Sequence, residues 1–495
     1  MVSVLGKCDW SFSINKTLNR VEQLESAESF GLALITLADQ AIVANLEPVI
    51  ANKYKATAIN LVKSIGKSEP GIQRSHFQVI AGWLYKVAED RCELDESLKK
   101  IEWIQKILTA APDTSLPPAN WPSDWLGLLT ATHALSACNH AGNTLTGAKY
   151  SMQIDDLTPQ VALRWEYTDD LMHAFITQAV HRNDCCDYLR ASERMESVGR
   201  FYETMNTFFK DAFPGVFPEK VHADLAGRAF GTQVQCETAC VLATAGEKAN
   251  EHLVRGRKAN NLATAEFESE QDKSRQRQYR CELETAARNY PEARSYLAAA
   301  IGIPDSNHQT ISNFLDEMPN GFNQGFQMLH WCRIGAMAGK SRDSLEFNAF
   351  LKAWQSSKLK HSTWASGLDL EGGKATVYPS HGILRHLSVI AAVSGDAHSV
   401  QKYLANLERV VTADRRPLFE LIAIAANLES LALHQPNTKI FHEALMKLLQ
   451  RISTVQNQVS STHREMGQML TNWLERLKGS PSTDTMLCLG RMIGY

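Results

Sequence analysis

The sequence predicts an all-α protein, an irregular array of antiparallel helical hairpins, and three observations support this prediction. Apolar residues recur at spacings of three and four along most of the chain, which is the period of an amphipathic helix. Short turns with glycine or proline separate these segments, so neighbouring helices are expected to run antiparallel. The chain has 495 residues, of which 44% are hydrophobic, and this supply is sufficient for sizeable buried cores.

The helical period first becomes clear in the amino-terminal part of the chain. The apolar positions are Phe77, Ile80, Leu84 and Val87 in one segment and Leu94, Leu98, Ile101, Ile104 and Leu108 in the next. Further along, Thr158 and Pro159 have the pattern of an N-cap followed by proline in the first turn, so we expect a helix to begin there. Its apolar stripe would contain Val161, Trp165, Met172, Ile176 and Ala179.

The carboxy-terminal part of the chain predicts a series of short helices. Their apolar positions are Leu384, Leu387 and Ala391; Val400, Leu404, Leu407 and Val411; Leu421, Ala425, Leu428 and Leu431; Phe441, Leu445, Leu448 and Ile452; and Met466, Leu470, Trp473 and Leu477. Pro417 opens the third of these helices, and Pro436 separates it from the fourth. Thr462 and Glu465 form a capping box before the last helix, and Gly479 ends it.

Several predicted helices end in a small residue, a glycine and a polar residue. The glycines are Gly142, Gly246, Gly339 and Gly395. Glycine adopts the left-handed conformation that closes a helix, so that another helix can begin at once. The spacings of 104, 93 and 56 residues are not the fixed period of a regular repeat family. From residue 325 onward the pattern resembles a degenerate TPR-like solenoid, and this resemblance implies a surface that binds other proteins.

Breaks rich in proline and glycine divide the chain into three expected regions, residues 1–111, 120–300 and 308–495. One further break carries the only strand signal in the sequence. There, two short segments rich in β-branched and apolar residues flank a pair of glycines, and they predict at most one small β-hairpin near residues 368–378.

Charge and hydropathy limit the classes of partner. The 51 basic residues are balanced by 54 acidic ones, and the net charge of −3 argues against a dedicated nucleic-acid binder. The first residues lack the apolar core of a signal peptide, and the most apolar stretch, residues 31–44, is too short and too polar to cross a bilayer. The ten cysteines show no C-x-x-C pair and no disulfide framework. We therefore expect a cytoplasmic protein without a membrane partner.

One acidic segment suggests an enzyme instead. The run from Asp169 through Asp170 to His173 resembles the DDxxD motif of all-α isoprenoid synthases, whose aspartates hold Mg²⁺ and a diphosphate. His173 stands where that motif has a third carboxylate, and imidazole is a poor ligand for Mg²⁺. The alternative, purely structural interpretation places Asp170 and His173 on the solvent-exposed face of a helix. These three residues are the candidate catalytic site, and no other cofactor or metal is predicted.

Two sets of residues are candidates for a protein interface. The charged stretch from 251 to 288 contains Arg275, Arg277 and Arg280, which would form a basic ridge for an acidic partner. Mixed charge is more typical of a solvated helix pair with salt-bridged faces. The tryptophans that border predicted loops could anchor an interface. They are Trp121, Trp125, Trp354 and Trp364.

The leading hypothesis from the sequence is a non-catalytic protein that binds another protein. Stacked hairpins bury their cores between them and leave a long face for recognition. A bacterial adaptor or scaffold, or an immunity-type protein that neutralises a toxin by binding it, fits the size and the near-neutral charge. The alternative is the all-α enzyme with an acidic metal and diphosphate site.

Overall fold

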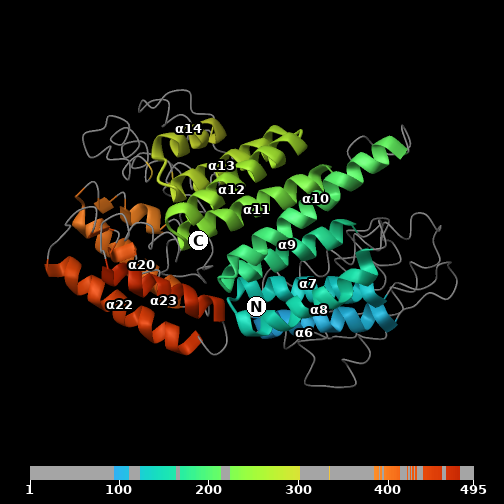
Figure 1. Ribbon diagram of the computed structural model, residues 1–495. Coiled ribbons are helices and arrows are strands. Elements are labelled where there is room, and N and C mark those ends of the chain that lie inside the picture. The colour runs from blue at the N-terminus through green and yellow to red at the C-terminus, as the bar shows by residue number, and fades with distance from the viewer. Residues whose placement is uncertain are drawn as a thin grey trace, which may run out of the picture. The chain divides into compact units, whose positions relative to one another are not determined.

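The structure is a computed structural model, and its described residues are helical or lie in the short turns that connect helices (Figure 1). The described residues are 94–110, 123–162, 168–212, 223–301, 330, 334, 384–389, 391–392, 395–412, 421, 424, 426–428, 430–431, 439–459 and 464–479. None of them belongs to a strand, which confirms the all-α prediction. The expected β-hairpin near 368–378 lies outside these residues. No helix in the described part of the chain is long and apolar enough to cross a membrane.

The chain divides into two compact units, Met1–His181 and Arg182–Tyr495. The described helices of the first unit are α6 (Leu94–Ala110), α7 (Ser123–His140), α8 (Thr144–Ala162) and most of α9 (Thr168–Asp184). Helix α7 packs against both α6 and α8. The three regions expected from the sequence stay a prediction, because residues 111–122 and 302–329 at their borders are not described.

The second unit begins with a run of helices that pack on one another in chain order (Figure 1). They are α10 (Tyr188–Ala212), α11 (Ala223–Ala243), α12 (Gly246–Glu266), α13 (Glu270–Ala286) and α14 (Tyr290–Ile301). Helix α11 contacts α10, α12 and α13, and α13 also contacts α12 and α14. Successive antiparallel helices therefore share their neighbours, as the predicted hairpin array requires.

The carboxy-terminal helices of this unit follow the predicted periodicity. They include α20 (Ala397–Thr412), α22 (Lys439–Val459) and α23 (Arg464–Gly479). Helix α22 buries its predicted stripe, which consists of Phe441, Leu445, Leu448 and Ile452. Burying a side chain of this size stabilises the fold by about 1.5–3 kcal/mol. The stripe therefore accounts for the position of α22 in the core.

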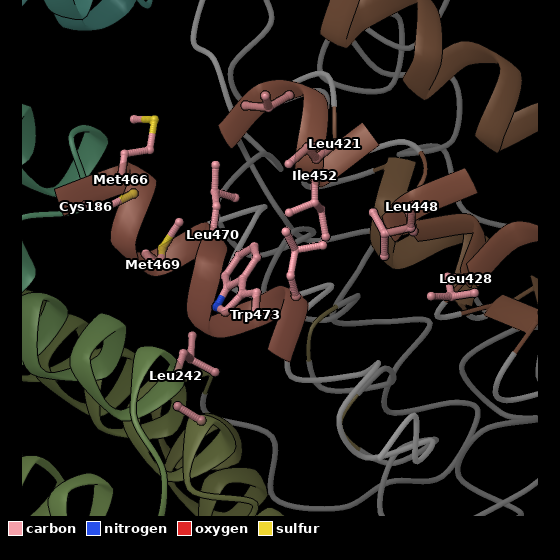
Figure 2. Packing of buried hydrophobic residues seen from close by; sticks show 14 of the residues in the cluster. Cys186, Leu242, Leu421, Leu428, Leu448, Ile452, Met466, Met469, Leu470 and Trp473 are labelled. Carbon is pink, nitrogen blue, oxygen red and sulfur yellow. The ribbon is translucent and has the colours of Figure 1, made fainter. Parts of the chain in front are cut away.

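Figure 2 shows how this core joins the earlier hairpins of the same unit. Met466, Leu470 and Trp473 on α23 belong to one buried cluster with Cys186 and Leu242, which lie far earlier in the sequence. A polar contact supports the packing, since the Tyr188 hydroxyl oxygen lies 3.7 Å from the Met469 sulfur. The prediction that Trp473 is a core residue is confirmed, because only 2% of it is exposed.

Among the described residues, four corners between helices have the same backbone geometry. The left-handed residues are Gly142, Cys186, Arg288 and Gly395, with φ between 63° and 74°. In each corner the N–H of the left-handed residue donates to the carbonyl three residues earlier. The N–H of the following residue donates to the carbonyl five residues before itself. This is the Schellman pattern, which satisfies carbonyls at the end of a helix. The glycine corners predicted at Gly142 and Gly395 are confirmed, whereas Gly339 lies outside the described residues.

The residue after each of these left-handed positions is directly before the first residue of the next helix, in the N-cap position. These residues are Asn143, Asp187, Asn289 and Asp396, and each carbonyl accepts the N–H four residues later. Gly246, with φ 63°, marks a fifth corner, although it already belongs to α12. The positions Gly142, Cys186, Gly246 and Arg288 lie 44, 60 and 42 residues apart. Each interval contains two helices, so a hairpin of variable length lies between successive corners. The spacing of glycines alone does not show this order, because Cys186 and Arg288 stand where other corners have glycine.

The predicted helix start at Thr158 and Pro159 is wrong. Helix α8 continues through Pro159 to Ala162, and α9 begins only at Thr168. The Thr158 hydroxyl donates back to the carbonyl of Ile154 at 2.7 Å, as it does inside a helix, and does not cap the turn ahead of it. The apolar period alone predicts one helix, because Val161 on α8 and Met172, Ile176 and Ala179 on α9 follow the same spacing.

Candidate functional site

A buried carboxylate lies where α10, α11 and α12 meet. Glu237 of α11 is fully buried, and side chains from both neighbouring helices reach it. The hydroxyl of Ser192 on α10 donates to Oε1 at 2.5 Å, and the Arg255 guanidinium of α12 contacts the same oxygen through Nε at 3.1 Å. The other oxygen, Oε2, shares a hydrogen bond of 2.6 Å with Nδ1 of His252. We call Ser192, Glu237, His252 and Arg255 the Glu237 network.

Small residues allow these helices to approach closely enough for the network to form. A Cβ atom on Gly256 would lie 2.8 Å from a methyl group of Leu283 and 3.2 Å from Cβ of Glu237. Ala259 and Ala263 continue the same buried stripe of α12, one and two turns further on. A larger side chain at Gly256 would push α12 away from both α11 and α13. This glycine therefore allows α12 to approach α11 closely enough for His252 and Arg255 to reach the carboxylate of Glu237.

A second buried carboxylate, Glu284 of α13, repeats the arrangement on the other neighbour of α12. Arg257 of α12 binds it through two nitrogens, at 2.8 Å and 2.6 Å. Arg280 donates to it at 2.7 Å, and the side-chain amide of Asn289 donates at 2.8 Å. We call these residues the Glu284 network. Helix α12 therefore binds the buried carboxylates of both adjacent helices.

The two networks also reach the surface of the array. Arg255 contacts Glu196 of α10 at 3.3 Å in addition to Glu237, so its guanidinium bridges a buried carboxylate and a partly exposed one. Arg280 lies over the ring of Tyr296 on α14, with 5.1 Å between the guanidinium carbon and the ring centroid. Arg255 thus connects α12 to α10 and α11 through charge-assisted contacts, and Arg280 connects two turns of α13 to α14.

Burial dominates the electrostatics of the ionisable groups in this region. For Glu284, burial alone raises the pKa, but hydrogen bonds from Arg257, Asn289 and Arg280 outweigh it and leave the pKa below its ordinary value. Burial raises the pKa of the Cys236 thiol to about 12 and raises that of Cys240 further, with the Glu237 charge acting in the same direction. Both thiols are therefore protonated at neutral pH and are poor nucleophiles in this state.

The order of contacts in the Glu237 network does not match a nucleophilic triad. In a triad the nucleophile bonds to the imidazole, and a carboxylate orients the imidazole from its other nitrogen. Here the Ser192 hydroxyl bonds to the carboxylate, which lies between the serine and His252. This arrangement holds a buried charge in place, whereas activation of the serine would require direct contact with the imidazole.

The candidate enzyme residues of the sequence lie on α9. Asp170 is partly buried and accepts a hydrogen bond of 2.7 Å from the indole N–H of Trp125 on α7. His173 is exposed, and its ring lies 5.4 Å from the ring of His133. Asp169 belongs to α9, but its side chain is not among the described ones. Among the described residues, the group with ligand atoms close enough for a metal is instead Glu237, Cys240 and His252.

The candidate interface residues occupy different environments. Trp125 is fully buried in α7, where its indole connects α7 to α9. Arg275 and Arg277 are partly exposed on α13 and pair with Asp272 and Glu270, whereas Arg280 is almost fully buried in the Glu284 network. Trp121, Trp354 and Trp364 lie outside the described residues.

Sequence reasoning did not find the Glu237 network, although part of its signal was present. Glu237 and Cys240 are spaced i and i+3 on one helix, so they share a face. His252 and Arg255 have the same spacing on the next helix, across the corner at Gly246. The available indication was a glutamate among the mostly apolar residues that end α11, followed by a histidine and an arginine one turn apart on its hairpin partner.

No protein-family model matches the sequence, and no curated protein matches it. Among solved structures, the chain is similar to one described as a circular tandem repeat protein with novel repeat topology and enhanced subunit contact surfaces. The identity is 12% and the TM-score 0.25, over 94% of this chain and 97% of that one. A TM-score this low supports no conclusion about function.

Proposed function

We propose that the chain is a non-catalytic protein-binding array whose surface helices recognise another protein. The main support is the outward face of α8 in the first unit. Leu145 and Met152 on this face are 60% and 68% exposed, although both are large apolar residues. They lie seven residues apart, which places them on one stripe two helical turns long.

The opposite face of α8 is packed, so the exposed stripe is not a consequence of a loosely attached helix. Gln178 of α9 donates to the carbonyl of Ser151 at 2.8 Å and to the carboxylate of Asp155 at 3.1 Å. Ile154 is fully buried beside them. A helix that is packed on one side and exposes apolar side chains on the other is typical of a surface that binds another protein.

The residues around the exposed pair are charged. Lys149 lies on the stripe between Leu145 and Met152, and Asp156 continues it by one more turn. Apolar contacts of this kind supply most of the affinity of an interface, while charged neighbours exclude wrong partners. We infer a partner that offers an apolar groove with polar edges. A cytoplasmic adaptor, a scaffold and an immunity-type binder each fit this surface, and the identity of the partner distinguishes them.

The test is recovery of a stoichiometric partner by the full-length chain from cells of its source. The double variant Leu145→Glu, Met152→Glu is expected to lose that partner while it keeps the helical circular dichroism signal. Gln153→Glu is the control, because it adds the same charge per substitution at an exposed position of the same helix. Equal recovery by the double variant contradicts the assignment of this face, and a wild-type chain that recovers no protein contradicts the function.

A further inference from the structure

Glu237, Cys240 and His252 bring three different metal-ligand types together between α11 and α12. One ligand atom of each residue lies within 4.8 Å of the other two. Glu237 and Cys240 are buried, and the His252 side chain is 13% exposed. We propose that these residues form a Zn²⁺ site that fixes the α11–α12 hairpin.

The carboxylate of Glu237 is held in the way that suits a metal ligand. Its Oε1 is already bound by Ser192 and Arg255, which fix the orientation of the group. Its Oε2 faces His252. In metal centres, hydrogen bonds to one part of a ligand commonly orient the atom that binds the ion. Oε2 is therefore the ligand atom, and Ser192 and Arg255 support it.

The charge balance around this position favours a cation. Glu237 and Glu196 carry two negative charges, and the Arg255 guanidinium between them supplies one positive charge. On zinc binding, the Cys240 thiol would lose its proton to solvent, and the ring hydrogen of His252 would lie on Nε2, so that a neutral imidazole binds the ion through Nδ1. One proton leaves and a dication enters, so the net charge of Glu196, Glu237, Cys240 and Arg255 changes from −1 to neutral.

The choice of zinc follows from the ligand set. Thiolate, imidazole and carboxylate together are typical of Zn²⁺, whereas Mg²⁺ and Ca²⁺ require mainly oxygen ligands. Ligand atoms about 2.0 Å from a tetrahedral zinc ion lie about 3.3 Å apart. The 2.6 Å between Oε2 and Nδ1 must therefore lengthen on binding. His252 can make this movement because it is the ligand that reaches solvent, and a water molecule would complete the four ligands on that side.

Cobalt substitution provides the direct test, because Co²⁺ bound to a thiolate absorbs in the near ultraviolet and visible range. The full-length chain is treated with a chelator, dialysed and titrated with Co²⁺. We expect one equivalent to bind with a thiolate-to-cobalt absorption band, and Zn²⁺ to displace it. We also expect Zn²⁺ to raise Tm, since a ligand that binds only the folded state stabilises that state.

Three variants make the outcome specific. Cys240→Ser is expected to remove the thiolate band, and His252→Gln to weaken Co²⁺ binding at least tenfold. Cys236→Ser is the matched control, because Cys236 is also buried and lies one turn earlier on α11 but does not belong to the ligand group. It should keep the band. If Cys240→Ser does not fold, His252→Gln decides the question, since His252 lies at the edge of the site. A wild-type chain without the band, or a band that survives both ligand variants, overturns the proposal.

Discussion

The Glu237 and Glu284 networks are two buried carboxylates in one hairpin array, and they differ in what neutralises them. Glu284 receives four hydrogen bonds from two guanidinium groups and an amide. Glu237 is bound by one guanidinium, a serine hydroxyl and an imidazole. Guanidinium groups keep their charge at every accessible pH, whereas imidazole and thiol groups exchange protons.

This difference separates a closed structural ion pair from a site with exchangeable partners. Removing one member of a buried ion pair is costly, because the charge that remains has lost its partner. In the Glu284 network both Arg257 and Arg280 would be affected, whereas in the Glu237 network Arg255 keeps its contact with Glu196. The first network should therefore contribute more to stability, and the second should tolerate a change of partner.

The largest expected effect is the loss of stability in Glu284→Gln. We expect the free energy of unfolding to fall by about 3–5 kcal/mol, because Arg280 stays buried without a carboxylate. Glu237→Gln should cost less, about 1–3 kcal/mol, since an amide can still accept the Ser192 hydrogen bond. Urea denaturation followed by circular dichroism measures both values.

Glu270→Gln serves as the control for these two variants. Glu270 pairs with Arg277 on the exposed face of α13, where an ion pair contributes about 0–1 kcal/mol. Equal losses for Glu284→Gln and Glu270→Gln would show that burial does not govern the strength of these pairs. A larger loss for Glu237→Gln than for Glu284→Gln would reverse the ranking of the two networks.

A smaller effect concerns the corners beside the two networks. The corner in the Glu237 hairpin has glycine in the left-handed conformation, Gly246, whereas the corner after Glu284 has Arg288, with φ 65°. Arg288→Gly is expected to stabilise the protein by about 0.5–1 kcal/mol, because glycine adopts this conformation without the steric cost of a Cβ atom. Gly246→Ala should destabilise it by about 1 kcal/mol, although no atom lies within 4 Å of the added Cβ.

If backbone conformation controls the stability of these corners, thermal unfolding should show a higher Tm for Arg288→Gly and a lower Tm for Gly246→Ala than for the wild type. Side-chain contacts of Arg288 would work against the gain. A fall in Tm for Arg288→Gly would therefore mean that the arginine side chain contributes more than its left-handed backbone costs.

The helices and their buried stripes could be predicted from the sequence because their cause is local. The stripe of α22 follows the period of 3.6 residues, and Phe441, Leu445, Leu448 and Ile452 are buried as expected. The corner at Gly142 was also predictable, since glycine is the residue that adopts its conformation most readily.

The corners at Cys186 and Arg288 could not be predicted, because tertiary contacts override the preference of the residue there. Cys186 is buried in the core cluster with α23, and its thiol accepts a hydrogen bond from Tyr188 at 3.4 Å. Asn289 after the second corner donates to Glu284 through its side chain as well as its backbone. These partners come together only in the folded chain, and the same holds for the buried carboxylate networks.

The smallest effect is the acid sensitivity that the Glu284 network should produce. The pKa of Glu284 lies below the ordinary value of 4.5 in the folded protein, so the folded state binds the proton more weakly than the unfolded state. The stabilisation is therefore complete above about pH 4.5 and decreases as the pH falls from there through the folded-state pKa. Urea midpoints at pH 7, 4.5 and 3.5 should fall more steeply for the wild type than for Glu284→Gln. Parallel pH profiles would show that the carboxylate is not linked to folding, and its arginine contacts would then not distinguish it from the Glu237 network.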